Sequence, residues 1–125
     1  MAKNFLSNTF TLSMLDTDRA YTLRINPVKP DEIPPNVRSI VGHKSTAKVL
    51  TQALGRHVPY NRVSFKLRSK DTLYVAKYVG ERPPEFIEEL DEVAKMFFFK
   101  VNVMYADRKG NYDGFCIKRK NRYHD

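Results

Sequence analysis

The sequence has few of the residues that build disulfide or metal frameworks, and it has no long apolar run. It holds one cysteine and no tryptophan among 125 residues, which excludes an internal disulfide and any zinc site made of several cysteines. Its longest strongly apolar run, residues 96–99, is far shorter than a membrane span requires. No apolar signal-peptide core stands near the start. We therefore expect a soluble, cytoplasmic protein with no membrane partner.

Short motifs of several enzyme classes are also missing. The sequence contains no Gly-x-Ser-x-Gly, no P-loop and no dinucleotide fingerprint. His43, His57 and His124 show no metal-ligand spacing. The acidic run at residues 85–92 fits the polar face of a helix better than a metal-binding carboxylate set. We expect neither a metal nor another cofactor.

What the chain does have is positive charge and core-forming residues. Lys and Arg number 22 against 14 Asp and Glu, which gives a net charge of +8. Hydrophobic residues make up 42% of the chain, with eight Phe and seven Tyr, so intrinsic disorder is excluded. The length predicts one domain. The basic balance favours anionic partners.

Residue patterns predict five strands and two helices. Strands are expected at residues 4–6, 21–25, 62–68, 72–79 and 97–105. The turn at 69–71 predicts that strands 62–68 and 72–79 form a hairpin, with Val63, Phe65 and Leu67 facing inward. Four prolines within residues 26–36 predict a surface crossing.

The first predicted helix spans residues 45–54, with Ser45 or Thr46 as its cap and Gly55 as its stop. The second begins at Pro83 and ends near residue 95. Together these elements predict an α/β protein of the α+β type, with a single mixed β-sheet and two main helices packed on it. A turn and a returning strand at 112–117 are expected in the tail.

The segment 41–46, at the start of the first predicted helix, is the most informative for function. A helix N-terminus has unpaired N–H groups and partial positive charge, which suit a phosphate. Gly42 would let a ligand approach the backbone closely, and His43 can exchange a proton near neutral pH. The alternative is that His43 simply precedes the helix and Ser45 simply caps it.

Three further candidates have equally simple alternatives. Arg82 has a guanidinium that could bind phosphate through two hydrogen bonds, or it could pair with a carboxylate in solvent. Glu85 could act as a base, or it could complement a helix dipole. Arg62 is either a phosphate contact or a solvated charge at a strand end. The basic residues within 118–122 either grip nucleic acid or are only solvated.

Several of these segments, in order along the chain, resemble one family. They are residues 5–15, residues 39–46 with Gly-His-x-Ser-Thr at 42–46, residues 54–63 with Asn-Arg-Val at 61–63, and Arg82-x-x-Glu85. This arrangement resembles the viral ring nucleases, the type III anti-CRISPR proteins of archaeal viruses and phages with cellular relatives. The similarity covers residues 4–104 and divides the chain into a ring-nuclease-like domain at 1–105 and a basic extension at 106–125.

The resemblance implies a homodimer that encloses cyclic tetra-adenylate, the second messenger of type III CRISPR defence. Such an enzyme cleaves the ring to linear di-adenylates without metal, through attack by the ribose 2′-hydroxyl, and so switches the defence off in the host cytoplasm. Two alternatives stay open: a binder that sequesters the ring without cutting it, and a regulator that binds DNA or long RNA, which is not favoured.

The resemblance also implies roles for individual residues. It assigns catalysis to His43, Arg82 and Glu85. It assigns ligand binding to Asn8, Thr11 and Arg62. We expect Thr9, Gly42, Lys44, Ser45 and Thr46 to bind the ligand together with them. Two departures from the family pattern stand out: Thr11 replaces a common Ser, and Phe86 follows Glu85 where Gly is common.

Overall fold

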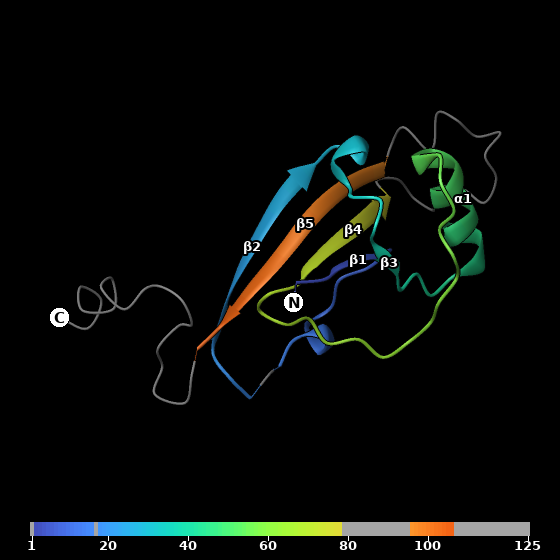
Figure 1. Ribbon diagram of the computed structural model, residues 1–125. Helices are drawn as coiled ribbons and strands as arrows, with labels where there is room; N and C mark the ends of the chain where they lie inside the picture. The colour runs from blue at the N-terminus through green and yellow to red at the C-terminus, as the bar shows by residue number, and fades with distance from the viewer. Residues whose placement is uncertain (1, 17, 79–95, 107–125) are drawn as a thin grey trace.

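A five-stranded sheet forms the centre of the protein (Figure 1). The computed structural model describes residues 2–16, 18–78 and 96–106. The strands are β1 (Asn4–Ser7), β2 (Tyr21–Val28), β3 (Arg38–Ser39), β4 (Thr72–Tyr78) and β5 (Met96–Tyr105), in the order β2-β5-β4-β1-β3. β1 runs parallel to β3 and β4, whereas β5 runs antiparallel to β4 and β2. The prediction of one mixed sheet is confirmed.

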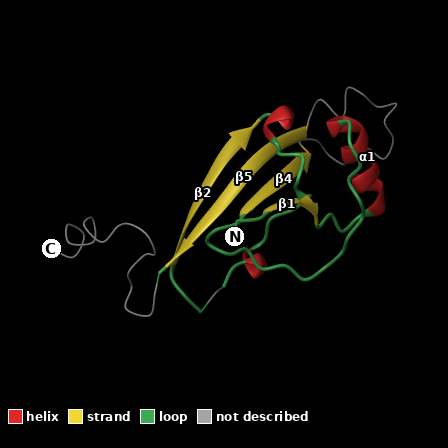
Figure 2. Ribbon diagram, viewed as in Figure 1, coloured by secondary structure: helices red, strands yellow, loops and turns green. Residues whose placement is uncertain are grey.

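One α-helix, α1 (Lys44–Leu54), occurs among the described residues, and it packs on one face of the sheet (Figure 2). Gly55 ends it in the left-handed conformation (φ 70°), which favours glycine. The predicted helix and its stop are therefore confirmed, but its predicted cap is wrong: His43 is the N-cap residue, and Ser45 and Thr46 lie inside the first turn. Over the described residues the fold is α+β with a single main helix. The second predicted helix, at 83–95, lies outside the described residues.

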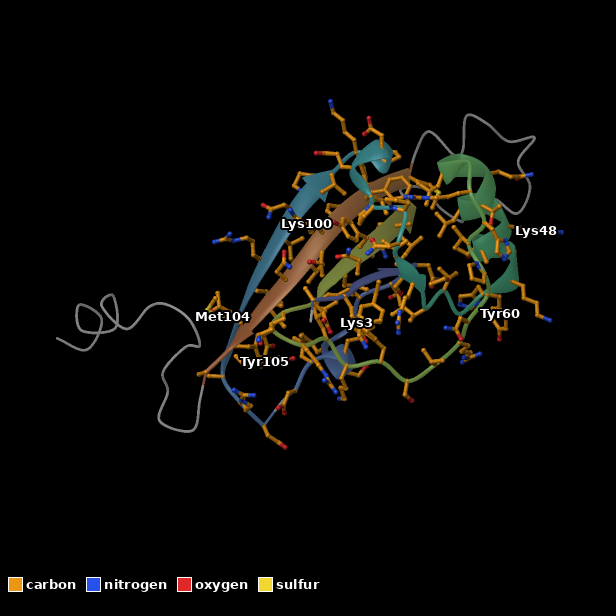
Figure 3. The ribbon with its side chains drawn as sticks, in the orientation of Figure 1. Lys3, Lys48, Tyr60, Lys100, Met104 and Tyr105 are labelled. Atoms are coloured by element: carbon orange, nitrogen blue, oxygen red, sulfur yellow. The ribbon has the colours of Figure 1, made fainter. Side chains whose placement is uncertain are left out.

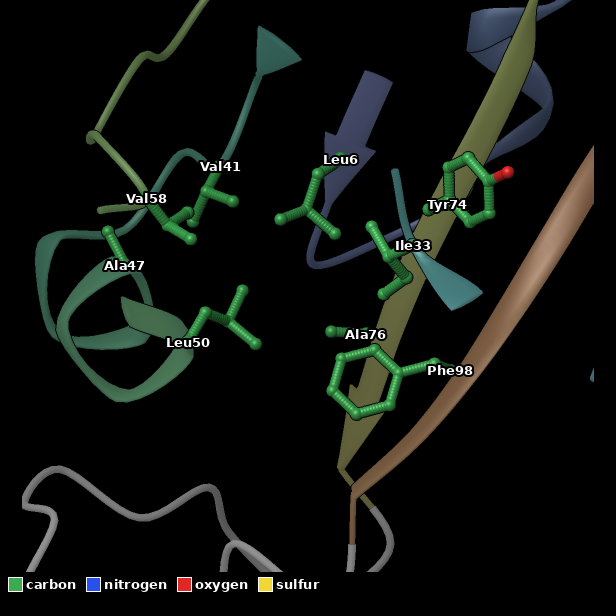
Figure 4. Packing of buried hydrophobic residues seen from close by; sticks show 9 residues of the cluster. All are labelled: Leu6, Ile33, Val41, Ala47, Leu50, Val58, Tyr74, Ala76 and Phe98. Atoms are coloured by element: carbon green, nitrogen blue, oxygen red, sulfur yellow. The ribbon is translucent and has the colours of Figure 1, made fainter. Parts of the chain in front are cut away.

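The core between α1 and the sheet joins residues from distant parts of the chain (Figure 4). Ala47 and Leu50 of α1 face Leu6 of β1, with Ala76 and Phe98 from β4 and β5 in the same cluster. Ala47 and Leu50 are three positions apart, which places both on one side of a helix. This packing fixes the start of α1 beside the ends of β1 and β3.

A second core covers the opposite face of the sheet. Leu73, Val75 and Val101 belong to it, together with Leu15 and Leu67, which come from outside the sheet. Leu15 directly follows the short 3-10 helix η1 (Leu12–Met14). Because β4 is covered on both faces, its apolar residues are almost continuous along the sequence.

The predicted hairpin at 62–68 and 72–79 is wrong. Residues 62–67, which we call the strap, form no strand and cross the second face of the sheet instead. β4 is already paired with β1 on one side and with β5 on the other, so neither of its edges is free. Leu67 is buried as expected and Phe65 is partly buried, but Val63 is 50% exposed.

Strand β2 is longer than predicted, and the proline-rich crossing is correspondingly shorter. β2 continues through Pro27 to Val28, and Pro27 lies opposite Phe99 of β5. β2 is an edge strand, where a residue without an N–H group is tolerated. A second 3-10 helix, η2 (Pro30–Glu32), follows.

No helix in the described ranges has the length and apolar character needed to cross a membrane. The returning strand predicted at 112–117 lies outside those ranges.

Candidate functional site

An open pocket of about 750 Å³ lies where β1 and β3 end and α1 begins. Residues 7–9, 13–14, 40, 42–43 and 62–66 line it. Because β1 and β3 are parallel, the residues that follow each strand emerge at the same end of the sheet. The Gly42 N–H accordingly donates to the side-chain oxygen of Asn8 at 3.5 Å. The topology thus joins two loops that are 34 positions apart.

His43 lies at the mouth of this pocket as the N-cap residue of α1. Its carbonyl accepts the N–H of Ala47 at 3.0 Å, but its side chain makes no capping hydrogen bond, and the first turn holds no acidic residue. The imidazole is exposed. The unpaired N–H groups of the first turn and the positive end of the helix dipole therefore remain available to an anion.

Arg62 reaches the pocket because Asn61 ties its backbone to the segment after β3. The Asn61 N–H donates to the Val41 carbonyl at 2.9 Å, and the Asn61 amide donates to the Ser39 carbonyl at 2.8 Å. A Cβ atom added to Gly42 would lie 3.6 Å from Cγ of Arg62, an ordinary contact. Gly42 thus leaves open the space next to the Arg62 side chain.

A further wall of the pocket is built from the strap and η1. The Leu67 N–H donates to the Met14 carbonyl at 2.7 Å. The Lys66 ammonium donates to the carbonyls of Ser13 and Leu15 at 2.7 and 3.3 Å. Ser13 also shares a 2.7 Å hydrogen bond with the Thr11 hydroxyl. These bonds join two segments into one structural unit.

The lining is cationic. Arg62 and Lys66 contribute positive charge, His43 can add to it, and no Asp or Glu occurs among the described lining residues. Such a pocket attracts anions such as phosphates. Elsewhere in the described ranges, no three His, Cys, Asp or Glu side chains gather as a possible metal site.

The pocket brings together five of the predicted site residues: His43, Asn8, Thr9, Gly42 and Arg62. The others in the described ranges surround it without lining it. Lys44, Ser45 and Thr46 form the first turn of α1, and Thr11 contacts the wall through Ser13. Nζ of Lys44 lies 5.7 Å from the ring centre of Tyr60, which is labelled in Figure 3. Arg82 and Glu85 lie outside the described residues.

Sequence reasoning missed most of the wall. Met14, Ser64, Phe65 and Lys66 line the pocket, although the alternation at 62–68 assigned Phe65 to the core and Ser64 and Lys66 to the outer face of a strand. For Ser64, Phe65 and Lys66, the position shortly after Arg62 was an available signal. A sequence pattern cannot indicate that the strap docks on η1, because that contact is formed across about 50 intervening residues.

The fold and the pocket define an α+β protein with an open cationic site at the start of its main helix. Residues 4–99 match the model of the STIV B116-like family, and the chain belongs to that family. A solved structure, B116 of Sulfolobus turreted icosahedral virus, matches with a TM-score of 0.62 and 21% identity, over 80% of this chain and 98% of that one. This similarity supports the fold and links it to a viral protein. No curated protein sequence matches the chain.

Proposed function

We propose that this protein is a ring nuclease that cleaves cyclic tetra-adenylate to linear di-adenylates and so switches off type III CRISPR defence in the host cytoplasm. One observation carries the proposal: the pocket gathers His43, Gly42, Arg62 and Asn8 from three separate segments around an uncapped helix N-terminus. The ring-nuclease resemblance assigns His43, Arg62 and Asn8 to catalysis and ligand binding, and Gly42 belongs to the helix start that is predicted to bind phosphate. The viral relative is consistent with the proposal.

The reaction needs little from the protein beyond alignment, charge and a proton. The ribose 2′-oxygen attacks the adjacent phosphorus, the bond from phosphorus to the 5′-oxygen breaks, and a 2′,3′-cyclic phosphate forms. The 2′-hydroxyl loses its proton to water, and His43 donates a proton to the departing 5′-oxygen. Two such cuts convert the ring into two linear di-adenylates. Since the substrate supplies the nucleophile, no metal is required to create one.

The charge that develops on the phosphate would be stabilised by fixed groups. Arg62 lines the same pocket as His43, and the first-turn N–H groups of α1 follow directly after His43. Preorganised donors of this kind stabilise transition-state charge strongly. Arg82 would add a second cation, and Glu85 would orient Arg82 or His43. Both assignments rest on the ring-nuclease resemblance.

The test is chromatography of cyclic tetra-adenylate incubated with the protein in excess chelator. We expect linear di-adenylates to accumulate beyond one equivalent of protein. A ring that is bound but recovered intact would identify a sequestering protein instead. Failure to bind the ring, together with binding to DNA or linear RNA that weakens steeply with salt, would favour a nucleic-acid-binding regulator.

A further inference from the structure

The pocket has two chemically different halves. Gly42, His43 and Arg62 form a polar, cationic half beside the start of α1. Met14, Val63 and Phe65 add apolar side chains to the same lining. A site that binds only phosphate needs hydrogen-bond donors and positive charge, and apolar side chains do not contribute to such binding. A nucleotide needs both kinds of surface, because its phosphate is charged and its base is flat and largely apolar on its faces.

We infer that the part of the lining formed by η1 and residues 63–66 of the strap is a nucleobase subsite, next to the phosphate site at Gly42, His43 and Arg62. In this arrangement one adenine of the ligand lies against Phe65, Val63 and Met14, while its phosphate lies at His43 and Arg62. The inference rests on the proposed function in one respect: it takes the ligand to be a nucleotide.

Phe65 is held in a position suited to this role. Its ring packs against Phe5 of β1 with a centroid distance of 4.7 Å and an interplanar angle of 60°, and it is only partly buried. One side of Phe65 therefore rests on the core while the residue also lines the pocket. An aromatic ring anchored in this way provides a stacking surface with little loss of side-chain entropy on binding.

The exposure of Val63 supports the same inference. The alternating pattern places it with Phe65 and Leu67, yet its side chain is 50% exposed and lines the pocket. A base lying on Val63 would remove this apolar surface from water.

The wall is also rigid before any ligand arrives. Lys66 and Leu67 fix the strap to η1 through three hydrogen bonds to backbone carbonyls. The hydroxyls of Ser13 and Ser64 lie on the same lining and can bind polar atoms at the edge of a base. A preformed surface of this kind avoids the cost of ordering a loop during binding.

The experiment is NMR of the methyl groups of Met14 and Val63 during titration with adenosine 5′-monophosphate, and separately with inorganic phosphate. We expect the monophosphate to shift both methyl signals through the ring current of adenine. Inorganic phosphate should instead shift the backbone amide signals at the start of α1. If adenosine 5′-monophosphate shifts the backbone amide signals at the start of α1 but leaves both methyl signals unchanged, the inference of a base subsite is wrong.

Variants test the same inference through affinity. Val63→Ser should weaken binding of cyclic tetra-adenylate by about fivefold through the loss of apolar contact. Phe65→Leu should weaken it by about 5- to 150-fold, the range of base–aromatic stacking. Ile25→Ser is the matched control, because Ile25 is 52% exposed and lies outside the pocket. Wild-type affinity in the folded Val63 and Phe65 variants would contradict the inference.

The outcomes separate this inference from the proposed function. If the ring is cut but the methyl groups and the two wall variants show no effect, the base subsite is wrong and the nuclease proposal stands. If adenosine 5′-monophosphate shifts the methyl signals but the ring is never cut, the nuclease proposal fails and the subsite stands.

Discussion

His43 and His57 are both exposed histidines, but their surroundings differ. His43 lines the pocket together with Arg62, and as the N-cap residue of α1 it directly precedes the first-turn N–H groups. His57 follows α1 and does not line the pocket. Of these two histidines, His43 is the one that a phosphate bound at the helix start would lie near.

His43→Ala should slow single-turnover cleavage of cyclic tetra-adenylate by about 10²–10⁴-fold, the usual contribution of a positioned general acid. Affinity for the ring should be largely kept, because Arg62 and the N–H groups of α1 remain. The measurement pairs the single-turnover rate with ligand affinity. His57→Ala is the control and should cleave at the wild-type rate. A folded His43→Ala protein with an undiminished rate would exclude the general-acid role.

Tyr74 gives the fold a dependence on alkaline pH. Burial raises the pKa of its phenol above the usual value of 10.0, and the negative charge of Glu32 raises it further. The folded state therefore holds this proton more tightly than the unfolded state. The stabilisation is complete below about pH 10 and is lost as pH rises through the raised pKa of the folded protein.

Urea unfolding at about pH 8 and pH 11 measures this effect. The wild type should lose more free energy of unfolding between these values than Tyr74→Phe, which keeps the buried ring and lacks the ionisable hydroxyl. Tyr60→Phe, at a side chain that is 44% exposed, should lose as much as the wild type. Equal losses in wild type and Tyr74→Phe would contradict the linkage.

At the scale of elements, local signals predicted local structure well. The apolar spacing at Ala47 and Leu50 and the stop at Gly55 were enough to predict α1, and the β-branched and aromatic run at Met96–Tyr105 to predict β5. The prediction of a strand in the region of the strap was wrong for a physical reason. An alternating pattern indicates which side chains avoid water, but it does not indicate which element lies beside the segment. The backbone N–H of Leu67 bonds to the Met14 carbonyl of η1 and not to β4.

The candidate site shows the same difference between local signals, which the sequence carries, and long-range contacts, which it does not. The helix start at 42–46 and Arg62 could be predicted, because a helix N-terminus and a guanidinium have local chemical signatures. The wall could not, because Lys66 takes its role from carbonyls of Ser13 and Leu15 that are more than 50 positions away. Contacts at such separation depend on the packed sheet.

Lys66→Met tests whether the strap depends on this anchor. Loss of the two hydrogen bonds from a charged donor should lower the free energy of unfolding by about 1–2 kcal/mol, measured by urea denaturation. Lys48→Met on α1, where Lys48 is exposed (Figure 3), should change it by less than about 0.5 kcal/mol. Equal effects of the two substitutions would show that Lys66 is only a solvated charge.

At the scale of the whole molecule, the open pocket is suited to closure by a second copy. A cyclic tetranucleotide can itself have two-fold symmetry, so two identical pockets facing one another would contact equivalent halves of it. Two exposed apolar side chains flank the pocket: Leu12, which is 60% exposed next to Ser13, and Tyr60, which is 44% exposed next to the strap. A partner seated over the pocket would cover them.

We therefore expect a dimer at micromolar concentration, with twice the 14.6 kDa chain mass by light scattering. Leu12→Asp should shift the protein toward monomer, because it would place a charge in the contact expected between two copies beside the pocket. Ile25→Asp should leave the dimer intact, since Ile25 is similarly exposed but lies on β2, at the edge of the sheet opposite β3. A monomeric wild type, with and without cyclic tetra-adenylate, would rule out closure by a second copy. If Ile25→Asp dissociates the dimer and Leu12→Asp does not, the two copies meet through β2, and each pocket must bind its ligand alone.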